Sequence, residues 1–321
     1  MLVVQNTKHF RIEKPTIVTI GTFDGVHLGH QKILSRLQQL KKKHGLTTLV
    51  LTFEPHPRMI LEPDNDELKL LTLIDEKLDM LENYGVDVTV VYPFDKEFSN
   101  IEAVDYIENI LVNNLHVKYL VIGYDHHFGK NRGGNIKLFE KLKDKYGYHI
   151  EEIDALDIDK STISSSRIRK SIEQGHMNMA NNFLGHNYFL NATVVHGKKL
   201  GRTLGYPTAN LKIVSKNKLI PKQGVYFVTV TFGKNNYYGM LNIGLNVTTD
   251  TDTNIKIEVN IFDFEGDLYG KTLKISFNNY LREEKKFNNL EELTQALNRD
   301  KEKCMKLIEE MNKIQCAVIK K

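Results

Sequence analysis

The feature that most constrains the fold is a change in the order of predicted elements about half-way along the chain. Up to about residue 153, short β-branched runs alternate with segments whose apolar residues recur at helical spacing. Strands separated by helices form a parallel sheet with helices on both faces, which binds ligands beyond the carboxyl ends of its strands. The predicted strands are 16–20, 47–53, 87–94, 119–125 and 148–153, and helices are predicted after the first strand and over 74–84, 101–114 and 135–146.

From Tyr188 onward, strand-like runs follow one another without intervening helices, and turn residues separate several of them. This order predicts an antiparallel β-barrel, closed by a helix over about 290–314. The fold class is therefore α/β, a doubly wound parallel-sheet domain followed by a barrel domain with a terminal helix. We expect domains at 1–184 and 185–321, with the boundary within 180–187.

The composition narrows the class of protein. A length of 321 residues suggests about two domains. The net charge of +4 lacks the concentrated basic stripe of a nucleic-acid surface, and no apolar run reaches the ~20 residues of a membrane span. The start has no signal-peptide layout, and the two cysteines, Cys304 and Cys316, build neither a disulfide framework nor a zinc cluster. We expect a cytoplasmic protein with neither a nucleic-acid nor a membrane partner; nothing in the sequence indicates its oligomeric state.

The stretch GTFDGVHLGH, residues 21–30, joins the first predicted strand to the next helix and carries His27 and His30. A helix N-terminus offers unpaired N–H groups and positive partial charge, which favour a phosphate, and glycines allow close approach. Imidazoles add hydrogen bonds to phosphoryl oxygens. Zinc would need further ligands, for which His56, His126 and His127 are available. By spacing alone, phosphate binding ranks slightly ahead of packing, with metal binding third.

Three further polar segments map to the same edge of the predicted sheet. FEPHP (53–57) follows the second strand, GYDHHFGKNRGG (123–134) the fourth, and STISSSRIRK (161–170) comes shortly after the fifth. In the last segment, serines can cap a helix while Arg167 or Arg169 reaches a phosphate. Each segment alone is explained by capping or surface exposure, but their convergence favours a nucleotide site.

These motifs carry a resemblance. GTFDGVHLGHQ with ISSSRIR is similar to the nucleotidyltransferase signature, and TFEPHP with GYDHHFG resembles the FMN adenylyltransferase module of bacterial bifunctional riboflavin kinase/FAD synthetases. The resemblance implies that FMN attacks the α-phosphorus of ATP and expels pyrophosphate, with Mg²⁺ accompanying the nucleotide. It implies roles in ATP phosphate binding for His27, His30, Arg169, Ser164 and Ser165, in ATP contact for Gly21, Phe23 and Gly29, and in the flavin and adenosine pocket for Gly123, Asp125 and Phe128.

The second half has its own polar features, each with an ordinary alternative. The glycines and basic residues of HGKKLGRTLGYPTANL (196–211) suit a polyphosphate or a plain surface loop. Thr208 and Asn210 offer neutral oxygens that suit Mg²⁺, or a capping turn. Glu258 is a general base if it faces a cleft and a solvent-facing charge if it does not, and Arg282 alone is explained as a surface residue.

In order, GRTLGYPTANL, GVYFVTV, NIG, IEVNIFDFEGDLYG and LREEKKF resemble a riboflavin kinase module. Two departures from the family pattern are LNVTTD in place of a Pro-Thr after NIG, and Asn260 in place of a histidine. The resemblance implies that Glu258 activates the riboflavin hydroxyl and that Arg282 belongs to a segment covering the flavin. It implies Mg²⁺ and ATP phosphate binding by Thr208 and Asn210, and nucleotide covering by the loop that contains Gly197, Gly201, Arg202 and Thr203.

The sequence therefore predicts one chain with two active sites and the substrates riboflavin, FMN and ATP. The barrel domain would phosphorylate riboflavin to FMN, and the N-terminal domain would adenylylate FMN to FAD. Two alternatives are a flavin- or nucleotide-binding regulator with one or both sites inactive, and a metal-dependent hydrolase using His27 and His30.

Overall fold

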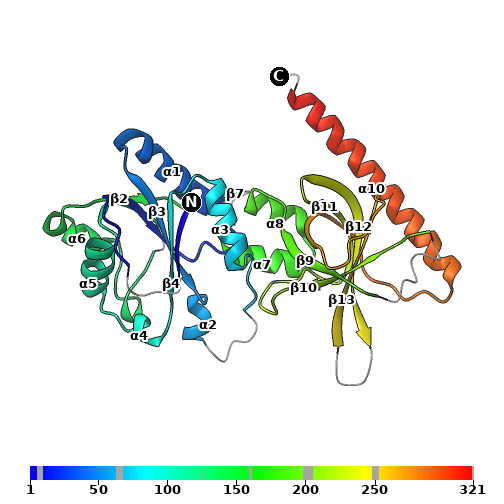
Figure 1. Ribbon diagram of the computed structural model, residues 1–321, viewed down its shortest axis with the longest axis horizontal. Coiled ribbons are helices and arrows are strands. Elements are labelled where there is room, and N and C mark those ends of the chain that lie inside the picture. Colours follow the sequence, from blue (N-terminus) through cyan, green and yellow to red (C-terminus); the bar gives the residue numbers. More distant parts are fainter. Residues whose placement is uncertain are drawn as a thin grey trace. The chain divides into compact units, whose positions relative to one another are not determined.

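The computed structural model describes residues 1–5, 10–62, 68–124, 126–158, 161–197, 205–247 and 253–319 (Figure 1). The predicted site residues Asp125, Gly201, Arg202 and Thr203 lie outside these ranges. The chain divides into two compact units, Met1–Arg167 and Ile168–Lys321. The predicted domain boundary at 184/185 stays a prediction; residues 177–184 form a helix that ends at Gly185, whose φ of 73° closes it.

The first unit is built on a six-stranded parallel sheet with the order β1-β4-β3-β2-β5-β6. Five of its strands were predicted from their β-branched runs. The edge strand β1 was not, because four residues are too few to show a periodicity. The strands are β1 Leu2–Gln5, β2 Thr16–Ile20, β3 Thr47–Glu54, β4 Val88–Pro93, β5 Val117–Gly123 and β6 His149–Ile153.

Helices cover both faces of this sheet, because alternate strand residues point to opposite sides. Ile17 of β2 packs with Leu37 and Leu40 of α1, whereas the adjacent Val18 belongs to the core cluster on the other face, which contains Ile107. The helical segments are α1 Leu28–His44, α2 Pro57–Leu61, α3 Ile74–Asn83, α4 Lys96–Ser99, α5 Ala103–Asp105, the π-helix η1 Tyr106–Asn114, the 3₁₀-helix η2 Lys130–Arg132 and α6 Ile136–Tyr146. The single helix predicted over 101–114 is thus a short α-helix followed by a π-helix.

The strand order fixes where a ligand would bind. The chain runs from β2 outward through β3 to β4 and then crosses to the opposite side of β2 to form β5. In sheets of this kind, ligands bind at the carboxyl ends of the strands where this reversal occurs. The segments that follow β2, β3 and β5 meet at this edge.

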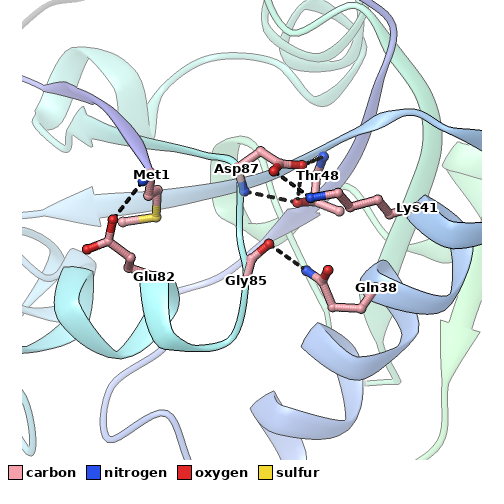
Figure 2. A network of polar contacts seen from close by, with 7 residues as sticks. All are labelled: Met1, Gln38, Lys41, Thr48, Glu82, Gly85 and Asp87. Carbon is pink, nitrogen blue, oxygen red and sulfur yellow. Dashed lines mark hydrogen bonds and ion pairs between the residues drawn. The ribbon is translucent and has the colours of Figure 1, made fainter.

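The opposite edge of the sheet is held by a polar network around Asp87 (Figure 2). The Asp87 carboxylate accepts hydrogen bonds from Lys41 Nζ at 2.6 Å and from the backbone N–H and hydroxyl of Thr48 at 3.0 and 2.9 Å. Partial burial tends to raise the pKa of this carboxyl, but the bonds from Lys41 and Thr48 outweigh it and leave the pKa below its usual value. The network ties the C-terminal end of α1 to the starts of β3 and β4.

Along the chain, the last strand of the sheet is followed by a two-stranded ribbon, β7 Asp157–Ile158 and β8 Ser161–Thr162, and by the helices α7 Ser165–Glu173 and α8 Met177–Leu184. Helix α7 begins in the first unit and ends in the second.

The second unit contains a closed antiparallel barrel with the order β10-β13-β12-β11-β14-β9. The sequence did not predict β10, because Pro207 and Asn210 favour a turn as much as a strand. Helix α10 Leu290–Ile319 packs on the barrel, where Leu297 and the buried Cys304 join a core cluster with Phe227 and Met240. The strands are β9 Phe189–Val195, β10 Ala209–Ile213, β11 Gly224–Phe232, β12 Asn235–Val247, β13 Thr253–Ile261 and β14 Thr272–Arg282. The predicted fold class is confirmed.

Candidate active sites

The loop after β2 has an unusual backbone. Phe23 and Val26 adopt positive φ values of 49° and 38°, and Gly25 has a φ of 83°. Positive φ costs a non-glycine residue about 1–3 kcal/mol and persists only where the surroundings impose it. Here Thr72 imposes it, since its backbone N–H donates to Asp24 Oδ1 at 2.9 Å and its hydroxyl accepts from Gly25 N–H at 3.0 Å.

This loop delivers the two histidines to the start of α1. His27 is the N-cap, and its Nδ1 accepts the backbone N–H of His30 at 3.4 Å. The two imidazoles stack with ring centroids 3.7 Å apart. Gly29 makes room for this arrangement, because a Cβ there would lie 3.2 Å from the His27 ring. Both histidines therefore sit where the N–H groups of a helix face the ligand-binding edge.

His30 is also packed, so the phosphate and packing interpretations are not exclusive. Its ring lies 4.8 Å from the ring of Phe23, which is 1% exposed and fills the core. Burial, followed by the charges of His27 and Lys77, holds the pKa of His30 well below its usual value, so the ring is neutral at pH 7. Its Nδ1 is buried, and no described residue forms a hydrogen bond with it.

Within the described ranges, the structure has no group of three or more His, Cys, Asp or Glu residues arranged to hold a metal ion. The hydrolase hypothesis, which requires such a group around His27 and His30, gains no support from the described residues.

Lys77 of α3 is a polar residue of this site that no sequence motif indicated, and it meets Thr52 and Glu54 of the TFEPHP segment near the end of β3. Lys77 is 4% exposed and donates to Thr52 Oγ1 at 3.3 Å. Burial lowers the pKa of Lys77, an effect that the nearby charges of Asp24 and Glu54 partly offset. The burial of Lys77 could have been predicted from the sequence, because Lys77 lies four residues before the buried Leu81 and so shares the apolar face of its helix.

Ser164 and Ser165 have distinct positions at the start of α7. Ser164 Oγ accepts the backbone N–H of Arg167 at 3.4 Å, as the capping interpretation expects. Ser165 donates to the carbonyl oxygen of Asp24 at 2.9 Å, which brings this helix start to the histidine loop. Arg169 is 8% exposed and lies in the part of α7 that belongs to the second unit. Its role in phosphate binding stays a prediction.

The predicted flavin and adenosine pocket is described in part. Gly123 is the last residue of β5. Phe128 is 7% exposed and stacks on Phe139 with centroids 4.2 Å apart, within the core of the first unit. His126 stacks on the same pair, and burial lowers its pKa to about 4. The described contacts of Phe128 are thus those of a packing residue, and its predicted ligand contact stays a prediction.

In the second unit, Glu258 lies in the middle of β13 between two asparagines. It is paired in register with Asn210 of β10 on one side and Asn242 of β12 on the other. Its side chain is 23% exposed and forms an ion pair with Lys256 Nζ at 2.8 Å. Asn242 in turn donates to Glu284 Oε1 at 3.5 Å. Glu258 is therefore neither a freely solvated charge nor a core residue. A partly buried carboxylate of this kind is what a proton acceptor in a cleft requires.

Asn210 is placed by its contact with Gly197. A Cβ at Gly197 would lie 2.0 Å from Asn210 Nδ2, so only glycine allows this approach. Thr208 is exposed two residues earlier, immediately before β10. The structure thus places Gly197, Asn210 and Glu258 on neighbouring parts of the barrel.

Arg282 is not the surface residue that an isolated arginine in the sequence suggested. Its guanidinium donates to the carboxylate of Asp300 on α10 with Nε–Oδ2 and Nη2–Oδ2 distances of 2.9 and 2.7 Å. Its side chain is 19% exposed and that of Asp300 is 2% exposed. Sequence reasoning missed Asp300 because it lies 18 residues from Arg282 on another element. Contact between Arg282 and a flavin stays a prediction.

Comparison with known proteins matches each half of the chain separately. A family described as FAD synthetase matches residues 9–167, and a family described as riboflavin kinase matches residues 184–308. Proteins named bifunctional riboflavin kinase/FMN adenylyltransferase match almost end to end. That of Buchnera aphidicola is 39% identical, covering 90% of this chain and 92% of its own, and that of Listeria monocytogenes is 37% identical, covering 89% and 90%. The chain belongs to this family.

As in other bifunctional riboflavin kinase/FMN adenylyltransferases, the two modules follow each other in one chain. The Bacillus subtilis member is 35% identical, with 93% of this chain and 94% of the relative covered. A solved structure described as a macrolide-efflux protein from Streptococcus pneumoniae has a TM-score of 0.84 and 30% identity, and covers 94% of this chain and 97% of its own. The fold of this enzyme is therefore one that has been observed before. No helix among the described residues is long and apolar enough to cross a membrane.

Proposed function

We propose that the chain makes FAD from riboflavin in two ATP-dependent steps, with one site in each unit. The observation that supports the proposal is that His27 and His30 lie together in the first unit, stacked at the start of α1, and Glu258 lies beside Asn210 on neighbouring strands in the second. A regulator with inactive sites is not favoured, because both modules match families of enzymes and both histidines and Glu258 are present.

In the N-terminal unit, a phosphate oxygen of FMN would attack the α-phosphorus of ATP. The new bond joins that oxygen to the α-phosphorus, and the bond from the α-phosphorus to the bridging oxygen breaks and releases pyrophosphate. No protein nucleophile is needed, so positioning and charge stabilisation supply the catalysis. The N–H groups at the start of α1 and the imidazoles of His27 and His30 would be the donors that stabilise this charge. Ser164, Ser165 and Arg169 would extend the phosphate contacts.

In the barrel unit, Glu258 would accept the proton of the riboflavin 5′-hydroxyl as its oxygen attacks the γ-phosphorus of ATP, and ADP would leave. The ion pair with Lys256 holds the carboxylate in place. The hydroxyl of Thr208 and the amide oxygen of Asn210 are hard oxygen donors of the kind that Mg²⁺ accepts beside phosphates, so these residues fit the ion. When bound there, Mg²⁺ would neutralise phosphate charge. Arg282 would contribute to flavin binding.

A cytoplasmic location is part of the proposal and agrees with a chain whose two cysteines do not form a disulfide framework.

The test is to incubate the purified chain with riboflavin, ATP and Mg²⁺ and to separate the flavins by chromatography. We expect both FMN and FAD, and a preparation that makes neither would refute the proposal. His30→Ala should stop FAD formation and leave FMN formation, whereas Glu258→Gln should stop FMN formation and still convert added FMN to FAD. Each variant thus serves as the folding control for the other, and loss of both reactions in a folded variant would contradict the two-site assignment.

A further inference from the structure

Lys77 is a buried cation, and the packing of the fold does not explain why a charged side chain occupies this position. It lies in the first turn of α3 and is 4% exposed. Its ammonium donates to Thr52 Oγ1 at 3.3 Å, and Thr52 donates onward to the carbonyl oxygen of Thr22 at 3.3 Å. Thr52 lies two residues before the end of the central strand β3, and Thr22 lies at the start of the histidine loop. The ammonium is therefore at the ligand-binding edge of the sheet.

The ammonium is under-satisfied. It has three N–H donors, and in the part of the chain that the structure describes it has one hydrogen bond, to a neutral hydroxyl, with no carboxylate oxygen within 4.0 Å. Asp24 and Glu54 act on it only as more distant charges. Asp24 Oδ1 is already occupied by the backbone N–H of Thr72 at 2.9 Å. Among the described residues, two N–H donors of this buried cation thus have no hydrogen-bond partner.

A second unsatisfied polar group belongs to the same cluster. His30 Nδ1 is buried and has no hydrogen-bond partner in the described part of the chain, and the charge of Lys77 acts on this imidazole. Buried polar groups without partners are rare in native proteins, and a buried ammonium is costly unless it is paired. Two such groups together, beside the N-terminus of α1, make a site that becomes satisfied when a group with several acceptor oxygens enters.

We propose that Lys77 is a phosphate-binding residue of the adenylyl transfer site and that, together with His30, it binds phosphoryl oxygens of a substrate. This inference rests on the proposed function of the N-terminal unit. The phosphoryl group is either part of the ATP triphosphate or the phosphate of FMN, and the two share the chemistry that a buried ammonium recognises.

The experiment compares wild-type full-length protein with Lys77→Met, which keeps the length of the side chain and removes its charge, and with Lys77→Arg. Lys137→Met, at an exposed lysine of α6 in the same unit, is the matched control. FAD formation is measured with ATP and FMN varied in turn. For Lys77→Met we expect kcat/KM to fall by about 10²-fold, the size of effect seen when one preorganised donor to a developing charge is lost. Lys137→Met should not change it.

The substrate that binds Lys77 follows from the KM values. A raised KM for ATP alone assigns the ammonium to the triphosphate, and a raised KM for FMN alone assigns it to the flavin phosphate. Lys77→Arg should retain part of the activity, because it keeps the positive charge. The thermal unfolding temperature of Lys77→Met should be equal to or above that of wild type, since removing an unpaired buried charge removes a desolvation cost. A purely structural lysine gives the opposite pattern, with lower stability and nearly unchanged kcat/KM.

Folded Lys77→Met with kcat/KM within about threefold of wild type would overturn the inference while leaving the proposed function intact. A wild-type chain that makes no FAD would instead overturn the proposed function. If Lys77→Met does not fold, the wild-type protein labelled with ¹⁵N-lysine decides. The Lys77 ammonium signal should shift when inorganic pyrophosphate or FMN is added, and an unchanged signal at saturating concentrations of both would refute the inference.

Discussion

The ion pair between Arg282 and Asp300 gives the sharpest stability prediction. It joins the last residue of β14 to α10, and α10 covers the barrel core through Leu297 and Cys304. Asp300→Ala removes the carboxylate and leaves a guanidinium that is 19% exposed without its partner. Helix propensity does not oppose this change, because alanine is the best helix former.

The magnitude follows from the burial of the pair. The Arg282 side chain is only 19% exposed, so removing the Asp300 carboxylate leaves a largely buried charge unpaired, at a cost of about 3–5 kcal/mol. For a folding unit of the size of Ile168–Lys321, each 1 kcal/mol lowers Tm by about 2–4 °C. The expected loss is therefore roughly 6–20 °C in the unfolding of the barrel.

The chain contains no tryptophan, so the barrel is best followed by hydrogen exchange of its peptides and by the temperature that inactivates the kinase. Glu302→Ala, at an exposed residue of the same helix, is the control and should leave Tm unchanged. The double variant Arg282→Met with Asp300→Leu should recover most of the loss, because no charge is then stranded. A Tm for Asp300→Ala within 2 °C of wild type, or a double variant as unstable as the single one, would show that the pair is not what holds α10.

Two further predictions concern other parts of the molecule. Because the folded-state pKa of Asp87 is depressed, its contribution to stability is present above the unfolded pKa of about 3.9 and is lost as the pH falls through the folded value. Asp87→Asn should therefore lower the free energy of unfolding by about 1 kcal/mol at pH 7, after allowance for partial exposure, and by much less near pH 3. Urea unfolding of wild type and variant at pH 7 and pH 3 measures this difference. An equal loss of stability at the two pH values would contradict the prediction. Gly197→Ala places a Cβ 2.0 Å from Asn210 Nδ2 and so displaces that side chain. Riboflavin phosphorylation should fall by about 10²-fold, whereas FAD formation from added FMN should be kept. An unchanged kinase rate would refute the placement of Asn210.

The sequence by itself determined the elements and the class of fold. The runs at 16–20 and 224–232 correspond residue for residue to β2 and β11, because strand and helix periodicities are set by local backbone geometry and are written in consecutive residues. The position of His27 and His30 at a helix start was predictable for the same reason, since capping depends on neighbours three residues apart.

Only the tertiary structure decided which distant residues complete the sites. Asp24 and Thr72 are 48 residues apart, and their contact imposes the positive φ values that aim the histidine loop. Lys77 lies on a helix whose sequence pattern does not predict that it contacts Thr52 of β3. Arg282 of β14 pairs with Asp300 of α10, which the sequence around either residue does not predict. Such pairings depend on how the chain closes over its core, which the order of residues along one segment does not encode.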